Sequence, residues 1–295
     1  MKYKKSITTL VLIIFILATI ASCYGIFSGD ISNIKEFKAI SGQNVNLYAK
    51  GLYKNDSVSI GLQAIGQDIV TLIIGLPLLL ISLFIYRKNL LKGKLLLTGT
   101  LGYFLYTYTS YSFLSMYNSF FLIYVMLMSL SFYAFTLTMM SFDIENISSC
   151  FSKKLPVKLI GGVLIFMAIA VGMMWLGIIL PALKQEIFPK LLEQYSTLTI
   201  QVLDLGFVVP TTILAGVLLI KRKPFGYLLA SVMIIKEVTL VTAIISMVIV
   251  QIHSGINVGL IQILMFSIFD LVLIYFLLLI MKNIDEKKYT EDKII

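Results

Sequence analysis

Long apolar segments recur along the whole chain and constrain its fold more than any other feature. A helix rises about 1.5 Å per residue, so about 20 apolar residues cross the roughly 30 Å hydrocarbon core of a bilayer. We place eight such segments at 7–27, 67–86, 95–115, 119–140, 159–181, 197–220, 225–251 and 259–281. The sequence therefore predicts an all-α fold, a polytopic helical membrane bundle of about eight transmembrane helices.

The composition favours one membrane domain over residues 1–295. Hydrophobic residues make up 59% of the chain and charged residues only 13%, which lies outside the range of soluble domains. The longest segment outside the predicted spans is an extracytoplasmic loop, 28–66. It places turn residues around the alternating run 44–48, which favours a small hairpin.

The basic residues follow a membrane topology. Most of the 24 Lys and Arg residues lie at one end of the predicted spans, next to both chain termini. The positive-inside rule then predicts cytoplasmic N- and C-termini in a multi-pass cell-membrane protein. The same rule explains the net charge of +9, so we expect the lipid bilayer and no nucleic acid as a partner.

Cysteine and histidine are too few for several classes of site. Cys23 and Cys150 lie on opposite sides in this topology, and His253 is the one histidine, so we expect no disulfide, metal or haem cofactor. The run from Ile20 to Cys23 fits a bacterial lipobox loosely. Two interpretations stay open: an uncleaved first helix, or cleavage that leaves a lipidated Cys23.

A pattern in the second span recurs in the sixth. Asp68 and Pro77 precede one basic turn, Asp204 and Pro210 precede another, and a Gly-Tyr pair follows each turn at 102–103 and 226–227. This suggests two parallel four-helix halves, 1–145 and 155–295. The alternative is that basic inner turns are common to all polytopic proteins.

Charged residues inside the predicted spans are the best functional candidates. A charge near the bilayer centre costs about 2.5 to 3.5 kcal/mol, so it usually faces the protein interior and finds a partner. We expect Lys236 to pair with Asp270 on the neighbouring span. Glu237 faces another way on the helix, without an assigned partner, and is therefore the candidate titrating group.

Further polar candidates lie in the second, third and sixth spans. Asp204 and Asp68 are expected to line an outward-facing vestibule, and Tyr106 and Tyr111 to lie deep in the membrane. Tyr103, Tyr117 and Trp175 are interpreted as interfacial residues. The alternative for the whole set is that buried polar pairs only hold helices together.

One stretch resembles known sequences. Residues 66–79, with Tyr103 to Tyr106 and Tyr117-Asn118 further on, make residues 50–140 similar to a set of uncharacterised bacterial multi-pass membrane proteins. The resemblance implies a bacterial membrane protein of the same fold. It implies no activity.

Absent motifs narrow the function. The chain has no nucleotide-binding P-loop, zinc-protease or serine-hydrolase motif. Whether it is an enzyme is therefore uncertain, and the missing motifs favour a protein that is not one. We expect binding or transport of a small solute, lipid headgroup or proton through a central polar cavity. The alternative is a non-catalytic membrane subunit or assembly partner of a larger complex.

Overall fold

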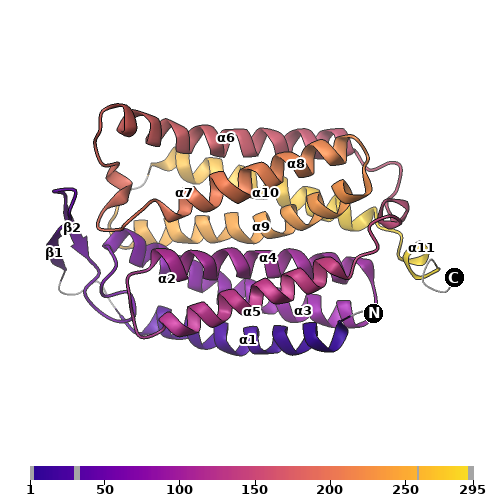
Figure 1. The fold of residues 1–295 in the computed structure, drawn as a ribbon, viewed down its shortest axis with the longest axis horizontal. Coiled ribbons are helices and arrows are strands. Elements are labelled where there is room, and N and C mark those ends of the chain that lie inside the picture. The colour runs from indigo at the N-terminus through magenta and orange to yellow at the C-terminus, as the bar shows by residue number, and fades with distance from the viewer. Residues whose placement is uncertain (1–2, 30–33, 258, 292–295) are drawn as a thin grey trace.

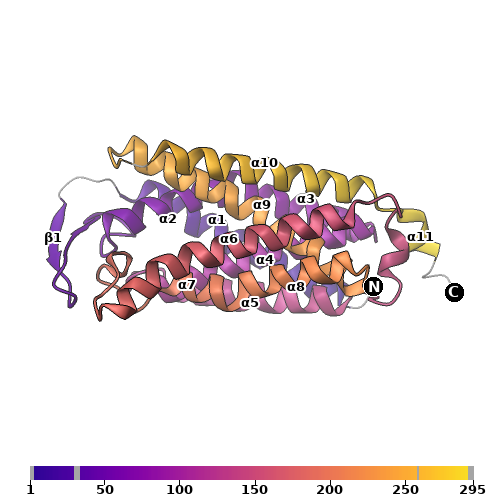
Figure 2. The same cartoon turned by 90° about the horizontal axis from the view of Figure 1, so that it is seen from above.

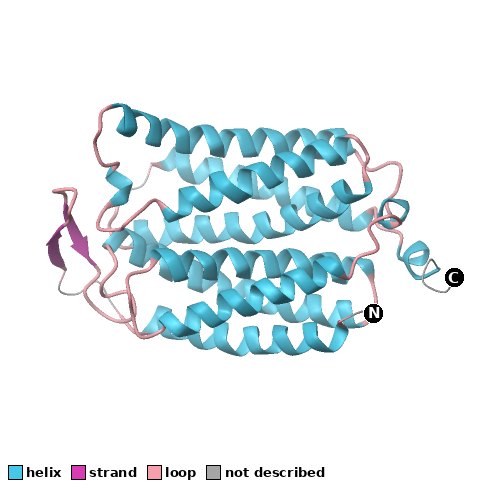
Figure 3. Cartoon of the chain, in the orientation of Figure 1, coloured by secondary structure: helices cyan, strands magenta, loops and turns pink. Residues whose placement is uncertain are grey.

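The computed structural model describes the chain except for residues 1–2, 30–33, 258 and 292–295. Its long helices lie side by side along the long axis of the molecule (Figures 1 and 3). The elements are α1 Lys4–Phe27, β1 Lys35–Lys38, β2 Asn44–Leu47, α2 Val58–Val70, η1 Thr71–Gly75, α3 Leu76–Arg87, α4 Leu91–Leu114, α5 Phe121–Met140, η2 Ile147–Cys150, α6 Val157–Lys184, η3 Lys190–Leu192, α7 Thr199–Leu203, η4 Asp204–Val208, α8 Val209–Ile220, α9 Pro224–His253, α10 Leu260–Lys282 and α11 Glu286–Glu291.

Among the described residues, seven helical segments are long and apolar enough to cross a membrane. They are α1, α2 to α3, α5, α6, α7 to α8, α9 and most of α10. The eighth long helix, α4, has 24 residues, as many as α1, but its threonine and tyrosine residues make it more polar. The predicted all-α membrane bundle is confirmed, with α4 as the segment that differs in composition.

The polar helix α4 lies at the centre of the bundle. It packs against α3, α5 and α9, while α9 packs against α2, α4, α8 and α10, so these two helices join the N-terminal helices to the C-terminal ones (Figures 1 and 2). A Cβ on Gly99 of α4 would lie only 2.4 Å from Cβ of Ile235 in α9. Glycine is therefore required for this close approach, which shields α4 from lipid.

The two ends of the bundle differ. The strands β1 and β2 form an antiparallel hairpin at one end, with Lys35 opposite Leu47, as the alternating sequence predicted; we call this the hairpin end. The opposite end, where α1 begins and α11 ends (Figure 1), is the basic end. Helix α2 begins at Val58, where the Ser57 side chain accepts a hydrogen bond from Ile60 N. The last part of the predicted loop 28–66 is therefore helical.

Helix α1 is an integral part of the bundle. It packs against α2, α3 and α5, and Ile7, Val11 and Ile14 are fully buried. Neither Cys23 nor Cys150 is part of a disulfide. The uncleaved first helix stays a prediction.

Two helices share one backbone irregularity. In each, a short π-helical segment, η1 or η4, ends two residues before a proline, Pro77 or Pro210. Proline lacks an N–H and disturbs the regular hydrogen-bond pattern of the preceding turn. Such π segments often mark functional sites within helices.

The turns that follow these two helices also correspond. Asn89 and Arg222 both have left-handed backbones, with φ of 63° and 52°. Shortly after them, a Cβ on Gly93 or Gly226 would lie 2.4 Å from a main-chain carbon of the preceding helix. In its contact with the preceding helix, Gly226 therefore resembles Gly93; the correspondence of the two Gly-Tyr pairs stays a prediction.

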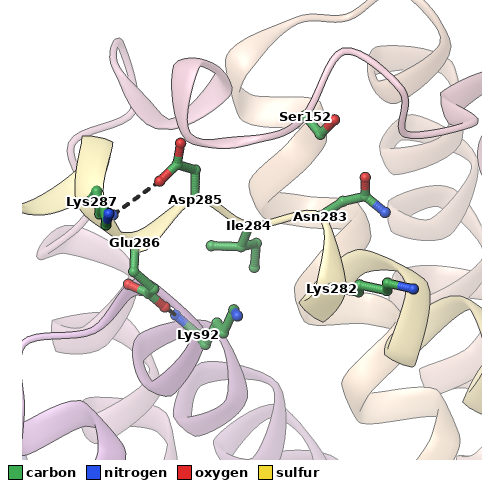
Figure 4. A pocket seen from close by; sticks show the side chains of 8 residues that line it. All are labelled: Lys92, Ser152, Lys282, Asn283, Ile284, Asp285, Glu286 and Lys287. Carbon is green, nitrogen blue, oxygen red and sulfur yellow. Dashed lines mark hydrogen bonds between the residues drawn. The ribbon is translucent and has the colours of Figure 1, made fainter.

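The segment after α10 closes the basic end. The Glu286 carboxylate accepts hydrogen bonds from Leu91 N at 2.7 Å and Lys92 N at 2.8 Å, which satisfies the first turn of α4. Ser152 N donates to Asn283 O. These contacts border a surface pocket of about 450 Å³ (Figure 4).

The close glycine contacts predict a stability difference. Gly93→Ala and Gly226→Ala each force a methyl group into backbone, and overpacking of this kind costs about 1 to 3 kcal/mol. Gly162→Ala is the matched control, because nothing lies within 4 Å of a Cβ there and alanine favours a helix. We expect lower thermal unfolding midpoints in detergent for the first two variants only; equal midpoints for all three would contradict the close contacts.

Candidate functional site

Lys236 is buried in α9 and pairs with its neighbour in sequence. Its Nζ lies 2.8 Å from Oε1 of Glu237, and the two side chains are 6% and 15% exposed. The predicted Lys236–Asp270 ion pair is therefore wrong, as is the prediction that Glu237 has no partner. Adjacent residues on a helix point only about 100° apart, and the flexible lysine stem spans that angle.

Asp204 is held by two aromatic side chains. Tyr106 Oη donates to Oδ1 at 2.7 Å, and Trp175 Nε1 donates to Oδ2 at 2.8 Å. Trp175 is thus not only the interfacial anchor that the sequence suggested. This pair of hydrogen bonds fixes the position of Asp204 at the start of η4.

Tyr106 connects these two groups. The Lys236 Nζ lies 4.3 Å from the centroid of the Tyr106 ring, while the hydroxyl of the same ring binds Asp204. We call Lys236, Glu237, Tyr106, Asp204 and Trp175 the Lys236 cluster. Its members come from α4, α6, η4 and α9, so the cluster lies where N-terminal and C-terminal helices meet.

Asp270 lies apart from the Lys236 cluster. Thr242 Oγ1 is 3.0 Å from Asp270 Oδ2 and 2.8 Å from Val238 O. A hydroxyl group has one proton to donate, so Thr242 shares it between these two acceptors. At 1.5 Å per residue, Thr242 lies about 9 Å along α9 from Lys236.

Asp68 forms a second, separate cluster toward the hairpin end. It is 1% exposed, and Tyr53 Oη donates to its Oδ2 at 2.5 Å. The Tyr111 hydroxyl lies 3.2 Å from Asp68 Oδ1 and 3.0 Å from Ala64 O, so its one proton is shared between these two acceptors. Asp68 and Asp204 therefore do not share the predicted open vestibule.

The two tyrosines predicted at the membrane interface differ in burial. Tyr103 is fully buried; Gln67 Nε2 donates to its hydroxyl at 2.8 Å, and the Thr71 hydroxyl lies at the same distance. Its interfacial interpretation is wrong. Tyr117 is 78% exposed, which fits that interpretation.

A third polar group lies outside the spans, at the hairpin end. Asp56 Oδ1 accepts hydrogen bonds from Met116 N at 2.8 Å and from Tyr195 Oη at 3.0 Å. Burial, opposed by these two bonds, raises the pKa of Asp56 to about 7, and the charge of Glu193 acts in the same direction as burial. Asp56 thus ties together the segments before α2, after α4 and before α7.

The described residues contain no group of three His, Cys, Asp or Glu side chains that could hold a metal ion. The basic-end pocket (Figure 4) contains none of the predicted site residues; it is lined by Lys92, Ser152, Lys282, Asn283, Ile284, Asp285, Glu286 and Lys287.

No family model, curated protein or solved structure matches this chain. The resemblance of residues 50–140 to uncharacterised bacterial membrane proteins stays a prediction. The long apolar helices indicate a multi-pass membrane protein. Its activity has to be inferred from the polar clusters.

Sequence reasoning missed several of the residues that complete these clusters. Tyr53 and Asp56 lie in a segment whose Gly, Asn and Ser residues indicate only turns, and Tyr195 lies in another loop. No local pattern links a loop tyrosine to a carboxylate far away in sequence. Only Trp175 carried a usable signal, since a buried indole N–H needs an acceptor.

The ion pair of Lys236 with Glu237 predicts a non-additive mutant cycle. Lys236→Met leaves Glu237 without its cation, and breaking a buried pair in this way costs about 3 to 5 kcal/mol. Adding Glu237→Gln should restore most of the loss. The measurement is the thermal midpoint of the two single variants and the double variant; additive losses would show that the two side chains do not interact.

Proposed function

We propose that the protein is a membrane transporter that binds a small solute at the Lys236 cluster together with one positive charge. The observation that carries the proposal is that the cluster holds one ammonium group and two carboxylates. Lys236 pairs with Glu237, whereas Asp204 has only neutral donors from Tyr106 and Trp175. Ionisable groups inside a membrane are costly and commonly functional.

The charge of the cluster indicates what it binds. Lys236 contributes +1, and Glu237 and Asp204 contribute −1 each, so the ionised cluster carries a net −1. A membrane interior disfavours that charge, and a cationic group of a bound solute removes it. The faces of Tyr106 and Trp175 also suit an organic cation.

The backbone around Asp204 supports movement. Asp204 opens η4, a π-helical segment that ends two residues before Pro210, and π segments and prolines are common sites of helix kinks and of function. In this proposal, binding of the positive charge weakens the bond from Tyr106 to Asp204. The helix from α7 to α8 then shifts against α4 and opens the site toward the other side.

The proposal also takes residues 1–145 and 155–295 as two copies of one four-helix unit. It is supported by η1 and η4, by the prolines that follow them, and by the matched turns at Asn89 and Arg222. The helix contacts correspond as well: α2 packs on α9 and α7 on α4. Parallel repeats of this kind place the binding site at their interface.

The orientation is part of the same proposal. We place the protein in a bacterial cell membrane with the basic end, and therefore both termini, in the cytoplasm, because lysine and arginine gather there. In a variant without native cysteines, Ile40→Cys in the exposed hairpin turn should react with a membrane-impermeant maleimide in intact cells. Lys153→Cys should react only after permeabilisation, and the reverse result would invert the orientation.

Ligand binding tests the function. Purified protein in an uncharged detergent is screened by thermal shift against a panel of small amines, amino acids, phosphates and sugars. We expect protonated amines or zwitterions to stabilise it; a ligand at 100 times its Kd adds about 2.7 kcal/mol. Asp204→Asn should abolish the shift, because the substituted cluster is already neutral. Glu145→Gln, an exposed acid outside the spans, should retain it.

Uptake of the stabilising compound into proteoliposomes, with and without a pH gradient, then tests transport and its coupling to protons. Equal binding by the wild type and Asp204→Asn would contradict the proposed site. In that case a membrane protein that co-purifies in a fixed ratio would favour the alternative, a subunit of a larger complex.

A further inference from the structure

Three buried oxygen atoms in two loop segments at the hairpin end lack a hydrogen-bond partner. They are Asp56 Oδ2, Glu193 Oε2 and Gln194 Oε1. Asp56 is 1% exposed, and its other oxygen already accepts two hydrogen bonds. Buried polar atoms are rarely left unpaired, so an unpaired group calls for an explanation such as a bound ion.

The three atoms belong to two loop segments that lie against each other. Tyr195 Oη donates to Asp56 Oδ1 at 3.0 Å, and Gln194 Nε2 donates to Asn55 O at 3.4 Å. The negative charges of Asp56 and Glu193 act on each other. Two carboxylates and an amide oxygen are thus gathered where no lysine or arginine pairs with them among the described residues.

We propose that Asp56, Glu193 and Gln194 bind a hard divalent cation of the calcium class. Calcium takes six to eight oxygen ligands, from carboxylates, amide and backbone carbonyls and water, in a flexible geometry. The two carboxylates supply the −2 charge that a divalent ion balances. Magnesium is less suited, because it demands a near-ideal octahedron and gives up its water reluctantly.

The site would join the two halves of the molecule. Asp56 directly precedes the helix from α2 to α3, and Glu193 and Gln194 precede the helix from α7 to α8. Calcium would therefore fix the hairpin-end loops of the two helices that contain the π segments. This inference does not depend on the proposed transport function.

The experiment measures thermal midpoints of the full-length protein in an uncharged detergent, in EDTA and across a calcium series, with magnesium as a second arm. We expect calcium to raise the wild-type midpoint, and EDTA to reverse the change. Asp56→Asn and Glu193→Gln should each weaken the apparent calcium affinity at least about tenfold, as loss of a metal-site group commonly does. Glu186→Gln, an exposed acid in the same connection as Glu193, should behave as wild type.

If Asp56 and Glu193 had only a structural role, their substitution would not change the thermal midpoint in different directions with and without calcium. In EDTA, Asp56→Asn and Glu193→Gln should be at least as stable as wild type, because each removes a like-charge contact; in calcium, both should be less stable. If Asp56→Asn fails to fold, Glu193→Gln carries the test. Terbium bound at the site should also show luminescence sensitised by Tyr195, and calcium should displace it.

Two results would overturn the proposal. One is a wild-type midpoint that is the same in EDTA and in calcium. The other is a calcium shift of wild-type size in Glu193→Gln, which would mean that calcium binds without this carboxylate.

Discussion

The close packing of α4 against α9 is the contact on which the rest of the structure depends. Gly99 lets the two helices approach until a single Cβ would clash with Ile235. That approach places the most polar of the long helices in the protein interior. It also sets Tyr106 beside Lys236, so that an ammonium group in the middle of an apolar helix has an aromatic face and a carboxylate to interact with.

The polar groups are distributed unevenly around this contact. On the N-terminal side, the buried network of Gln67, Thr71 and Tyr103 is uncharged, and hydrogen bonds satisfy it. On the C-terminal side, Asp204 opens the π segment as Thr71 does, but it is a carboxylate with neutral donors. The C-terminal half thus places a carboxylate at the start of its π segment, where the N-terminal half has a hydroxyl group.

The sequence predicted the helices well and their contacts poorly. Apolar length placed the long helices, and alternation placed the hairpin at β1 and β2, because both signals are local. The partners of Lys236 and the burial of Tyr103 could not be predicted. The period of a helix gives the direction of each side chain, but it does not show which neighbouring helix lies in that direction. The sequence did not predict the role of Asp56, because its partners, Met116 and Tyr195, lie in loops that are distant in sequence.

The sequence by itself determined that this chain is a multi-pass helical membrane protein and that charged residues lie within its spans. Both conclusions follow from the cost of exposing polar groups to hydrocarbon, which depends on composition along one segment. Only the tertiary structure decided which charges meet: Lys236 with Glu237, Asp204 with Tyr106 and Trp175, and Asp270 with Thr242. Such pairs depend on the distance between helices and on side-chain direction, which a few close glycine contacts set and which no single segment encodes.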